Sequence, residues 1–381
     1  MSPQPLRRRI GQLLIGSFSG PDVPVELRAL AREFDLGGTT LFGRLGNIEG
    51  PEQVAGLAFD AKSLGVELPG WVGVDQEGGR VARLRSPFTV WPPMAVLGRS
   101  DDPALAKRFA AALAAEVAAV GISLDYAPVL DIHTNPKNPV IGDRALGERP
   151  ETVARLGRVI IEELQRAGVA ACGKHFPGHG DTATDSHVEL PIVEHAPDRL
   201  RAIEFVPFKA AIEAGVAFIM TAHVLAVALD DQHPATLSRR IVTGILREEL
   251  GFGGVIVSDD LEMKALSNTM TPSEAAVAAI AAGCDAVLMC GSGSDAHINL
   301  QAEALEALIH AVEQEQIPLK QVEASLQRNR QAKQRFLQAQ NGRPTTSPLA
   351  REWRPPSASQ LKAVIGCDAH RAVSEDMSAF A

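Results

Sequence analysis

The sequence predicts an α/β protein that folds as a single-domain (β/α)8 TIM barrel with a short C-terminal tail. Short apolar runs alternate with Ala-, Leu- and Glu-rich helical segments along most of the chain. Glycine stands where a helical segment gives way to the next apolar run, as in Val120-Gly121-Ile122 and Ala167-Gly168-Val169. Because glycine adopts the left-handed conformation at low cost, it is typical of a helix end. Apolar strands that alternate with helices indicate a parallel sheet covered on both faces.

Eight apolar runs are predicted to be strands. In chain order they are Leu13–Phe18, Thr39–Phe42, Trp71–Asp75, Ser123–Pro128, Ala170–Lys174, Ala217–Thr221, Val255–Ser258 and Ala286–Met289. The helical segments between them include Pro103–Ala119, Glu151–Arg166, Leu237–Leu250 and Pro272–Ala282, and Leu319–Leu337 is expected to close the barrel. Eight units favour a barrel over an open doubly wound sheet, which usually has fewer strands and a glycine-rich phosphate-binding turn after the first. No such turn follows the first predicted strand.

The domain organisation follows from a change in composition near Gln340. Residues 1–340 are expected to form the barrel. Residues 341–381 are rich in Pro and Ser at first and are expected to form a tail that ends in a short helix near His370–Ser378. The tail is too short to form a second domain.

Composition and charge exclude several classes of protein. With 381 residues, of which 45% are hydrophobic, the chain can bury a large core, so neither a disordered protein nor a disulfide-stapled miniprotein fits. Its net charge of −9 argues against general binding to nucleic acids or anionic membranes. The cysteines Cys172, Cys284, Cys290 and Cys367 form no CxxC pair. We therefore expect reduced thiols rather than disulfides or a zinc site.

The N-terminal segment resembles a signal peptide only weakly. Arg7-Arg8-Arg9 precedes the apolar stretch Ile10–Phe18, but Gln12 and Gly16 interrupt it and no clear cleavage site follows. We interpret this segment as a short helix that leads into the first strand. No run approaches the roughly 18 apolar residues that a membrane span needs. A cytoplasmic protein without a membrane partner is expected.

Polar residues follow five of the eight predicted strands. They are Asp75 to Arg80 after the third strand, Asp131, Asn135 and Asp143-Arg144 after the fourth, Lys174-His175 after the fifth, Thr221 and His223 after the sixth, and Ser258-Asp259-Asp260 after the seventh. The carboxyl ends of the strands of such a barrel meet at one face, where its chemistry takes place. The sequence therefore predicts one polar pocket at that face.

The densest polar segment begins at Lys174 and continues to Asp185-Ser186-His187, and it holds three of the ten histidines. One hypothesis is a metal site formed by His175, His179 and His187 with Asp181 or Asp185. Pro177 and Gly178 argue against it, because they exclude the helix on which two histidines four residues apart act as a ligand pair. A purely structural role is the second alternative. The favoured interpretation is catalytic: the Asp185 carboxylate orients the His187 imidazole and raises its basicity.

Asp259 is the second catalytic candidate. It directly follows the apolar strand residues Val255–Val257, so its carboxylate is expected to project into the mouth of the barrel. A carboxylate there can act as a nucleophile or stabilise a cation. Asp260 is instead expected to cap a helix that follows at once.

Four motifs, in order, resemble glycoside hydrolase family 3. They are Gly73–Val81 (GVDQEGGRV), Lys174–Asp181 (KHFPGHGD), Asp185–His187 (DSH) and Ser258–Met263 (SDDLEM). More narrowly, they resemble the β-N-acetylhexosaminidase branch, whose bacterial members act in peptidoglycan recycling. The resemblance runs from about Ile10 to Leu337, which is most of the chain.

The resemblance implies a role for each matching residue. Asp259 matches the aspartate nucleophile of a retaining enzyme, and Asp185 and His187 match its acid/base dyad. Residues that bind the sugar match Asp75, Arg144, Lys174 and His175. Retaining glycosidases usually pair two carboxyl groups about 5 Å apart, whereas this branch uses a histidine as acid/base. The resemblance implies no cofactor and no metal.

The expected activity is release of terminal β-linked N-acetylglucosamine from muropeptide or chitooligosaccharide fragments. The small number of aromatic residues, 4% of the chain, supports an exo-acting pocket, because long glycan clefts stack sugars on many aromatic rings. A β-glucosidase and a glycoside phosphorylase of the same superfamily remain alternatives, as does a non-catalytic sugar-binding barrel. The large β-glucosidases add a second α/β domain that completes the site, which weakens that alternative for this chain.

Overall fold

The computed structural model describes residues 5–66, 68–186, 188–291, 295–337 and 353–381, and it contains a closed barrel of eight parallel strands. In chain order the strands are β1 (Leu14–Gly16), β2 (Gly38–Thr40), β3 (Trp71–Val74), β6 (Leu124–Asp125), β7 (Ala170–Phe176), β9 (Phe218–Thr221), β11 (Val255–Asp260) and β12 (Ala286–Leu288). Each strand pairs with the next, and Leu14 of β1 lies in register with Val287 of β12 to close the ring. All eight predicted strands and the (β/α)8 fold are therefore confirmed.

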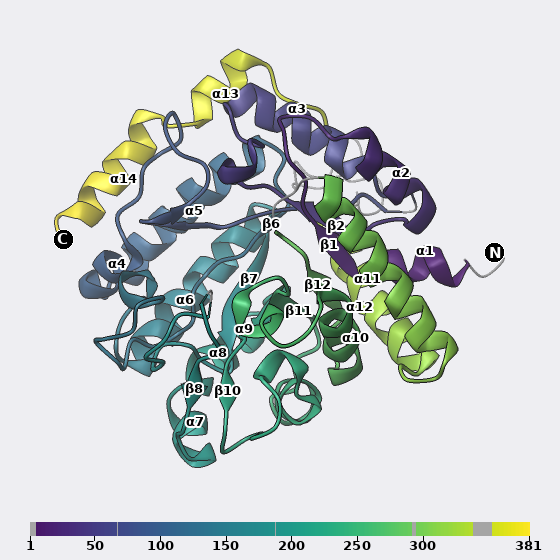
Figure 1. The fold of residues 1–381 in the computed structure, drawn as a ribbon. Helices are drawn as coiled ribbons and strands as arrows, with labels where there is room; N and C mark the ends of the chain where they lie inside the picture. Colours follow the sequence, from purple (N-terminus) through teal and green to yellow (C-terminus); the bar gives the residue numbers. More distant parts are fainter. Residues whose placement is uncertain (1–4, 67, 187, 292–294, 338–352) are drawn as a thin grey trace.

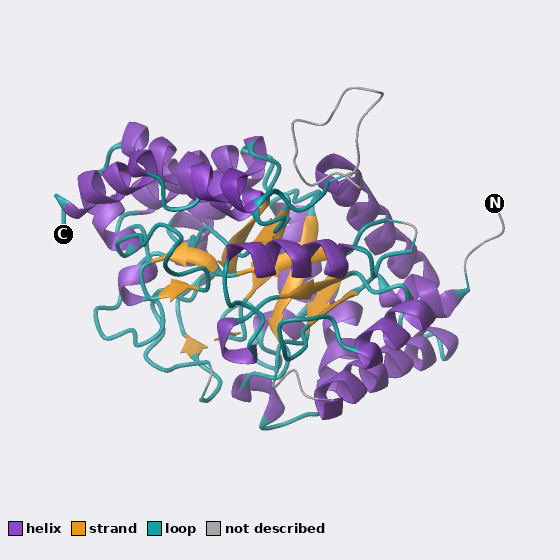
Figure 2. Cartoon of the chain, turned by 90° about the horizontal axis from the view of Figure 1, so that it is seen from above, coloured by secondary structure: helices purple, strands orange, loops and turns teal. Residues whose placement is uncertain are grey.

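Helices surround the strands on the outside of the barrel (Figure 1, Figure 2). They include α1 (Leu6–Gly11), α2 (Val25–Phe34), α3 (Pro51–Lys62), α5 (Pro103–Ala119), α6 (Pro150–Arg166), α8 (Phe205–Glu213), α10 (Pro272–Ala282), α11 (Asp295–Glu313) and α12 (Leu319–Leu337). The predicted helix over 237–250 is present as a π-helix, η4 (Arg240–Glu249). None of the helices that the structure describes is long and apolar enough to cross a membrane.

Local sequence signals explain where the helices begin and end. Helix α5 begins after Asp102, whose side chain accepts a hydrogen bond from Ala104 N. Helix α10 begins with a capping box between Thr271 and Glu274 and ends at Gly283, which adopts a left-handed φ of 119°. Such caps satisfy backbone groups that the helix itself leaves without partners. These signals position the helices against the strands that they connect.

Smaller elements lie in the loops. They are the hairpin β4 (Gln76–Gly78) and β5 (Val81–Ala82), the parallel pair β8 (Ile192–Val193) and β10 (Leu225–Ala226), the short helices α4 (Met94–Ser100), α7 (Pro197–Ala202) and α9 (Lys264–Ser267), and the 3-10 turns η1 (Gly43–Leu45), η2 (Gly142–Arg144) and η3 (Ala235–Leu237).

Aromatic side chains fill the barrel and the layer between strands and helices. The Trp71 ring meets the Phe218 ring edge to face, with centroids 5.2 Å apart, and Phe336 of α12 lies 6.4 Å from Trp71. Tyr126 is fully buried in the same interior, and its hydroxyl occupies the space beside Gly73, where a Cβ would lie only 2.6 Å from it. Gly73 on β3 thus leaves room for the only tyrosine in the chain.

The C-terminal segment folds into two helices that lie against α5 (Figure 1, yellow). The helix expected near residues 370–378 is α14 (Asp368–Ser378), and a further helix, α13 (Ala358–Val364), precedes it. Leu361, Val373 and Met377 are buried in the contact with the barrel. The predicted boundary at residue 340 lies outside the described residues, so the division into barrel and tail stays a prediction.

Candidate active site

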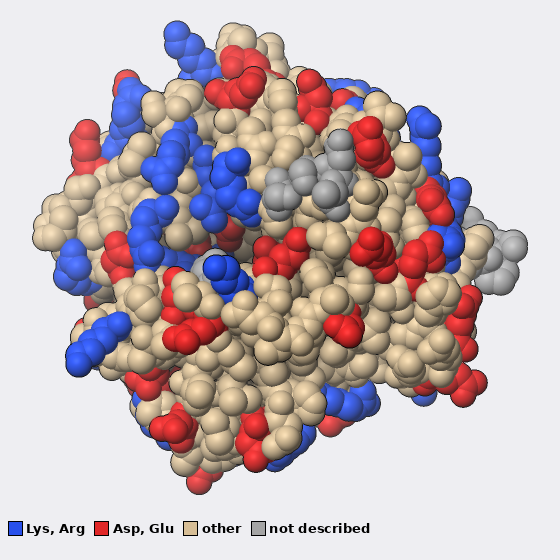
Figure 3. Space-filling view, viewed as in Figure 1, with Lys and Arg blue, Asp and Glu red and all other residues tan. Residues whose placement is uncertain are grey.

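A cavity of about 430 Å³ opens at the carboxyl ends of the strands. Its walls include six of the seven residues singled out in the sequence: Asp75, Arg144, Lys174, His175, Asp185 and Asp259. His187, the seventh, lies outside the described residues. Basic side chains gather on this face of the molecule beside a hollow (Figure 3), and Arg44, Arg80 and Arg83 line the cavity. Residues after four of the five predicted strand ends thus line one polar pocket, whereas Thr221 and His223, after the sixth predicted strand, are not among its lining residues and contact Thr236 instead.

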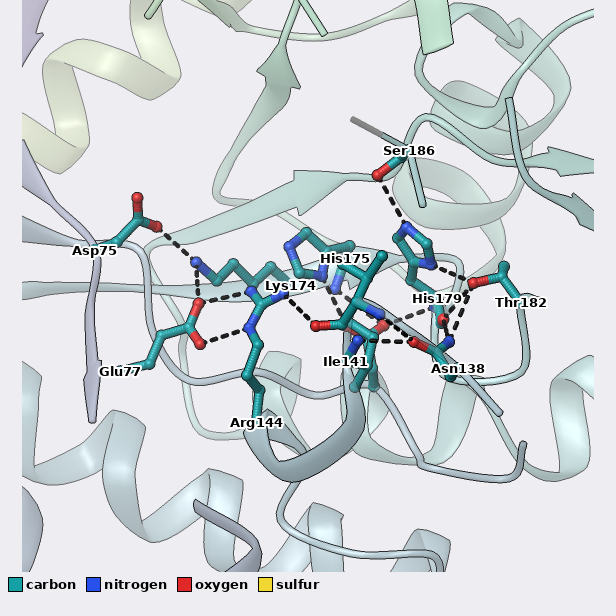
Figure 4. Close-up of polar contacts among 12 residues, drawn as sticks. Asp75, Glu77, Asn138, Ile141, Arg144, Lys174, His175, His179, Thr182 and Ser186 are labelled. Carbon is teal, nitrogen blue, oxygen red and sulfur yellow. Dashed lines mark hydrogen bonds and ion pairs between the residues drawn. The ribbon is translucent and has the colours of Figure 1, made fainter. Parts of the chain in front are cut away.

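Four charged side chains form a buried network on one wall of the cavity (Figure 4). Lys174 Nζ lies 2.7 Å from Asp75 Oδ1 and 2.6 Å from Glu77 Oε1. Arg144 donates two hydrogen bonds to Glu77, from Nε at 2.9 Å and from Nη2 at 2.8 Å. The side chains of Lys174 and Glu77 are only 3% and 1% exposed, so each charge depends on its partners. The network fixes Lys174 and Arg144 at the edge of the pocket.

Each charged group of this network shifts the pKa values of its partners so that they stay ionised. Burial by itself would raise the pKa of Glu77, but the cations Arg144 and Lys174 outweigh it and hold that pKa below its ordinary value. Burial likewise opposes the charge of Lys174, yet Asp75 and Glu77 raise its pKa above the ordinary value. The pKa of Asp75 is lowered because Lys174 and Arg83 outweigh its burial. All of these groups are therefore ionised at neutral pH.

Two residues of the site, Arg83 on the wall of the pocket and the buried Glu77, received no role in the sequence analysis. Glu77 joins Lys174 to Arg144, and Arg83 Nη2 lies 3.2 Å from Asp75 Oδ2. Gly78 ends β4, and Gly79 and Arg80 form the turn of the β4–β5 hairpin; both glycines have positive φ, and the turn returns the chain toward the pocket. A Gly-Gly pair between two short strand-like runs is a hairpin signal. That signal could have indicated that Arg83 lies next to Asp75.

Asp131 organises the histidine-rich segment. Its Oδ2 lies 2.6 Å from His175 Nδ1, and its Oδ1 accepts a hydrogen bond from His179 N at 2.7 Å. Burial by itself would raise the pKa of Asp131, but the interaction with His175 favours the carboxylate and, together with His179, lowers that pKa. Asp131 was predicted to face the pocket region, but its role as the anchor of His175 emerges only from the fold.

His179 is held on both sides of its ring. Nδ1 lies 2.7 Å from Thr182 Oγ1 and Nε2 lies 3.1 Å from Ser186 Oγ (Figure 4). Burial lowers the pKa of His179 to about 4, so the ring is neutral near pH 7. Within the described ranges, no group of three His, Cys, Asp or Glu side chains is placed to hold a metal ion.

The segment that carries Asp185 is anchored at several points. Ser186 accepts a hydrogen bond from Ala265 N at its carbonyl, in addition to its contact with His179. Asp181 forms an ion pair with His195 and accepts a hydrogen bond from Thr134 Oγ1 at 2.7 Å. These contacts hold Asp185 at the wall of the cavity.

Asp259 lies near the end of β11 and faces the cavity, and its Oδ1 accepts a hydrogen bond from Asp260 N at 2.8 Å. The predicted helix-capping role of Asp260 is wrong. Helix α9 begins only at Lys264 and its start has no side-chain cap. The Asp260 carboxylate instead accepts hydrogen bonds from Glu262 N at 3.1 Å and Cys290 N at 3.0 Å, because β11 continues through Asp260 into a turn.

Asp260 is expected to make the free energy of unfolding depend on pH. Burial raises its pKa from 3.8 to about 6, despite the opposing hydrogen bond from Cys290 N. The native state thus binds this proton more tightly than the unfolded chain, so its stabilising contribution is lost as pH rises through about 6. In Asp260→Asn the amide oxygen can accept the same hydrogen bonds. We expect its free energy of unfolding to exceed that of wild type by roughly 1–3 kcal/mol at pH 7.5 and to match it at pH 4.

Urea unfolding at the two pH values measures this difference. Asp198→Asn is the matched control, because the Asp198 side chain is fully exposed on α7, and we expect no pH-dependent gain from it. A gain in Asp260→Asn that is equal at both pH values would contradict the burial of a carboxyl with a raised pKa.

The fold and the site together define a class of protein. A closed barrel presents one carboxylate at a strand end, a second carboxylate on a neighbouring loop and a charged wall to a cavity of monosaccharide size. Such a site is typical of an enzyme that acts on a small polar substrate. The model of the glycosyl hydrolase family 3 N-terminal domain matches residues 5–331, and the chain belongs to this family of glycoside hydrolases.

Individual relatives share this assignment. A β-hexosaminidase from Thiobacillus denitrificans is 40% identical over 279 residues, which cover 72% of this chain and 75% of that protein. β-Hexosaminidase A from Pseudoalteromonas piscicida is 34% identical over 80% of this chain, but the match spans only 54% of that protein. A family 3 β-N-acetylglucosaminidase from Paenibacillus sp. str. FPU-7 superposes with a TM-score of 0.87 and 38% identity, over 99% of this chain and 69% of its own.

Proposed function

We propose that the chain is a retaining exo-β-N-acetylglucosaminidase that removes terminal β-linked N-acetylglucosamine. The observation that carries this proposal is that Asp259, Asp185 and the Asp75–Lys174 pair line one cavity. The relatives named β-hexosaminidase and β-N-acetylglucosaminidase support the choice of sugar. A cavity of about 430 Å³ is large enough for one terminal sugar, which suits exo action.

In the proposed mechanism the Asp259 carboxylate attacks the anomeric carbon while protonated His187 gives its proton to the leaving glycosidic oxygen. The bond to the aglycone breaks and a covalent glycosyl ester on Asp259 forms. Neutral His187 then removes a proton from water, which attacks the anomeric carbon and releases the sugar and the Asp259 carboxylate. Asp185 orients the His187 ring and favours its protonated form.

Asp75, Lys174, Arg144 and His175 are proposed to bind the hydroxyl groups of the sugar. Their positions are set by ion pairs and hydrogen bonds before the sugar arrives, notably Lys174 with Asp75 and His175 with Asp131. A site that is already organised spends little of its binding free energy on ordering side chains. Arg83, paired with Asp75, is added to this group from the structure.

Muropeptides and chitooligosaccharides are the proposed natural substrates, in the context of peptidoglycan recycling or glycan breakdown in the cytoplasm. No cofactor, nucleic acid or membrane takes part in the proposed reaction. A panel of nitrophenyl glycosides tests the choice of sugar. We expect hydrolysis of the β-N-acetylglucosaminide; cleavage of the β-glucoside alone, or a requirement for phosphate, would overturn it.

His187→Ala tests the acid/base role. We expect kcat to fall by roughly 10²- to 10⁴-fold on a substrate with a poor leaving group, because proton transfer to the leaving oxygen is lost. The first step should be affected far less with 2,4-dinitrophenolate, which leaves without protonation. Steady-state and burst kinetics on both substrates measure the contrast. Equal losses on the two leaving groups in the first step would contradict proton donation by His187.

A further inference from the structure

Glu116 of α5 is a buried carboxylate that joins two segments distant in the sequence. Its side chain is only 4% exposed. Oε2 accepts a hydrogen bond from Thr89 N at 2.9 Å, and Oε1 accepts one from Thr89 Oγ1 at 2.6 Å. Oε1 also accepts from Gly366 N at 2.9 Å and from His370 Nδ1 at 2.8 Å. A single carboxylate thus ties the segment around Thr89 to the C-terminal helices.

The first of these segments is part of the pocket wall. Residues 83–90, here called the Arg83 segment, begin at Arg83, which lines the sugar cavity and pairs with Asp75. Arg85 and Phe88 of the same segment line an adjoining cavity of about 370 Å³, which shares Phe42, Arg44 and Arg83 with the first. The position of the Arg83 segment therefore shapes both cavities.

The second segment, residues 357–381, is here called the C-terminal clasp. Besides its two contacts with Glu116, it touches the Arg83 segment directly. Ser374 Oγ donates a hydrogen bond to Val90 O at 2.7 Å. Gly366, with φ of 58°, lies so close to Pro87 that a Cβ on it would be 2.1 Å from Pro87 O. Only glycine allows this approach of one backbone to the other.

The two ends of the Arg83 segment are held differently. At its start, Gln76 Oε1 accepts hydrogen bonds from Arg83 N and Leu84 N, both at 2.9 Å, so Gln76 of the β4–β5 hairpin holds this end. At its other end, Thr89 is held by Glu116 and Val90 O by Ser374 of the clasp, and the carbonyl of the next residue, Trp91, accepts a hydrogen bond from Gly79 N. Without the clasp, Glu116 would keep its hydrogen bonds from Thr89 but lose those from Gly366 N and His370 Nδ1. The loss of hydrogen-bond donors is unfavourable for a buried carboxylate.

We propose that the C-terminal clasp is a positioning device for the substrate site: through Glu116 and His370 it holds the Thr89 end of the Arg83 segment and so restrains the segment that leads to Arg83 at the sugar cavity. This proposal rests on the proposed function for its substrate. Among the described residues, no residue of the clasp lines the cavity that Asp259 and Asp185 face, so loosening the clasp weakens ground-state binding and leaves the chemical step intact. His370 and Glu116 are positioning residues, not catalytic ones.

His370→Ala tests the proposal. We expect KM for a nitrophenyl β-N-acetylglucosaminide to rise about three- to tenfold, the effect of one lost hydrogen bond, with kcat within about twofold of wild type. Hydrogen exchange of residues 84–90 should become faster. His370→Asn, whose amide nitrogen takes the place of Nδ1 and donates to Glu116, should restore both values. Ser374→Ala, which removes only the bond to Val90 O, gives a second variant should His370→Ala not fold.

Asp376→Ala is the matched control. Asp376 lies on the same helix and forms an exposed ion pair with Arg108 of α5, 2.6 Å apart, without contacting the Arg83 segment. We expect no change in KM or in the exchange of residues 84–90. If His370→Ala and Asp376→Ala have equal KM values and equal exchange rates at residues 84–90, the proposed role of the clasp is wrong. If the wild-type protein cleaves no N-acetylglucosaminide, the proposed function is wrong. The hydrogen exchange of residues 84–90 in His370→Ala then still tests whether the clasp holds the Arg83 segment.

Discussion

Asp259→Asn is expected to lower kcat on a β-N-acetylglucosaminide by roughly three to four orders of magnitude, the loss typical when a catalytic group is removed. The amide is isosteric with the carboxylate but a far weaker nucleophile, so the glycosyl ester cannot form. Its oxygen can still accept the hydrogen bond from Asp260 N. We therefore expect the thermal unfolding midpoint and the affinity for N-acetylglucosamine to stay close to those of wild type.

A chemical rescue makes this prediction specific. In Asp259→Ala the space of the carboxylate is free for an external nucleophile such as azide, which should restore turnover and yield a glycosyl azide of inverted configuration. Asp185→Ala should not give an inverted azide, because Asp185 is proposed to act through His187. Turnover of Asp259→Asn within about tenfold of wild type would exclude Asp259 as the nucleophile.

Glu77→Ala is expected to have the largest effect on stability. Glu77 is the shared partner of Lys174 and Arg144, with side chains 3% and 9% exposed. Removal of the carboxylate leaves the buried Arg144 without its acidic partner and Lys174 with Asp75 alone, and breaking a buried pair in this way costs about 3–5 kcal/mol. We expect urea unfolding at neutral pH to show a loss of this size, together with loss of sugar binding because Lys174 and Arg144 shift.

The matched control for Glu77→Ala is Arg80→Ala. Arg80 pairs with Asp143 at 2.9 Å on the rim of the same cavity, but both side chains are about half exposed. Exposed pairs contribute only about 0–1 kcal/mol, so the control should unfold almost as wild type does. A Glu77→Ala protein as stable as Arg80→Ala would contradict the interdependence of the buried charges.

The fold could be predicted from the sequence because its signals are local. Apolar runs, helix-ending glycines and caps such as Thr271–Glu274 each act over a few residues, and all eight strands were located. The segment of η4 was predicted as a helix but not as a π-helix, since helical amphipathicity does not report which backbone hydrogen bonds form; α13, which begins with a capping box at Ser357 and Gln360, was not predicted. The turn after Asp260 was mistaken for a helix start, because a carboxylate accepts backbone hydrogen bonds in both settings.

The site was predictable only in part. The carboxyl ends of parallel strands must meet, so Asp75, Lys174 and Asp259 could be placed in one pocket without a structure. Glu77 and Arg83 lie on a hairpin inserted after β3, and their partners depend on how that hairpin folds back. The link from Glu116 to His370 spans 254 residues, and no local pattern in the sequence reports such a contact.

The central claim is that Asp259 carries the sugar as a covalent intermediate. A fluorinated N-acetylglucosaminide with an activated leaving group, which slows release of the sugar, would trap that intermediate for peptide mapping by mass spectrometry. We predict that inactivation of the wild-type enzyme adds one fluorosugar to the peptide that contains Asp259, and that Asp259→Asn gains none. Inactivation with the label on any other residue, or with no label on that peptide, would contradict the claim.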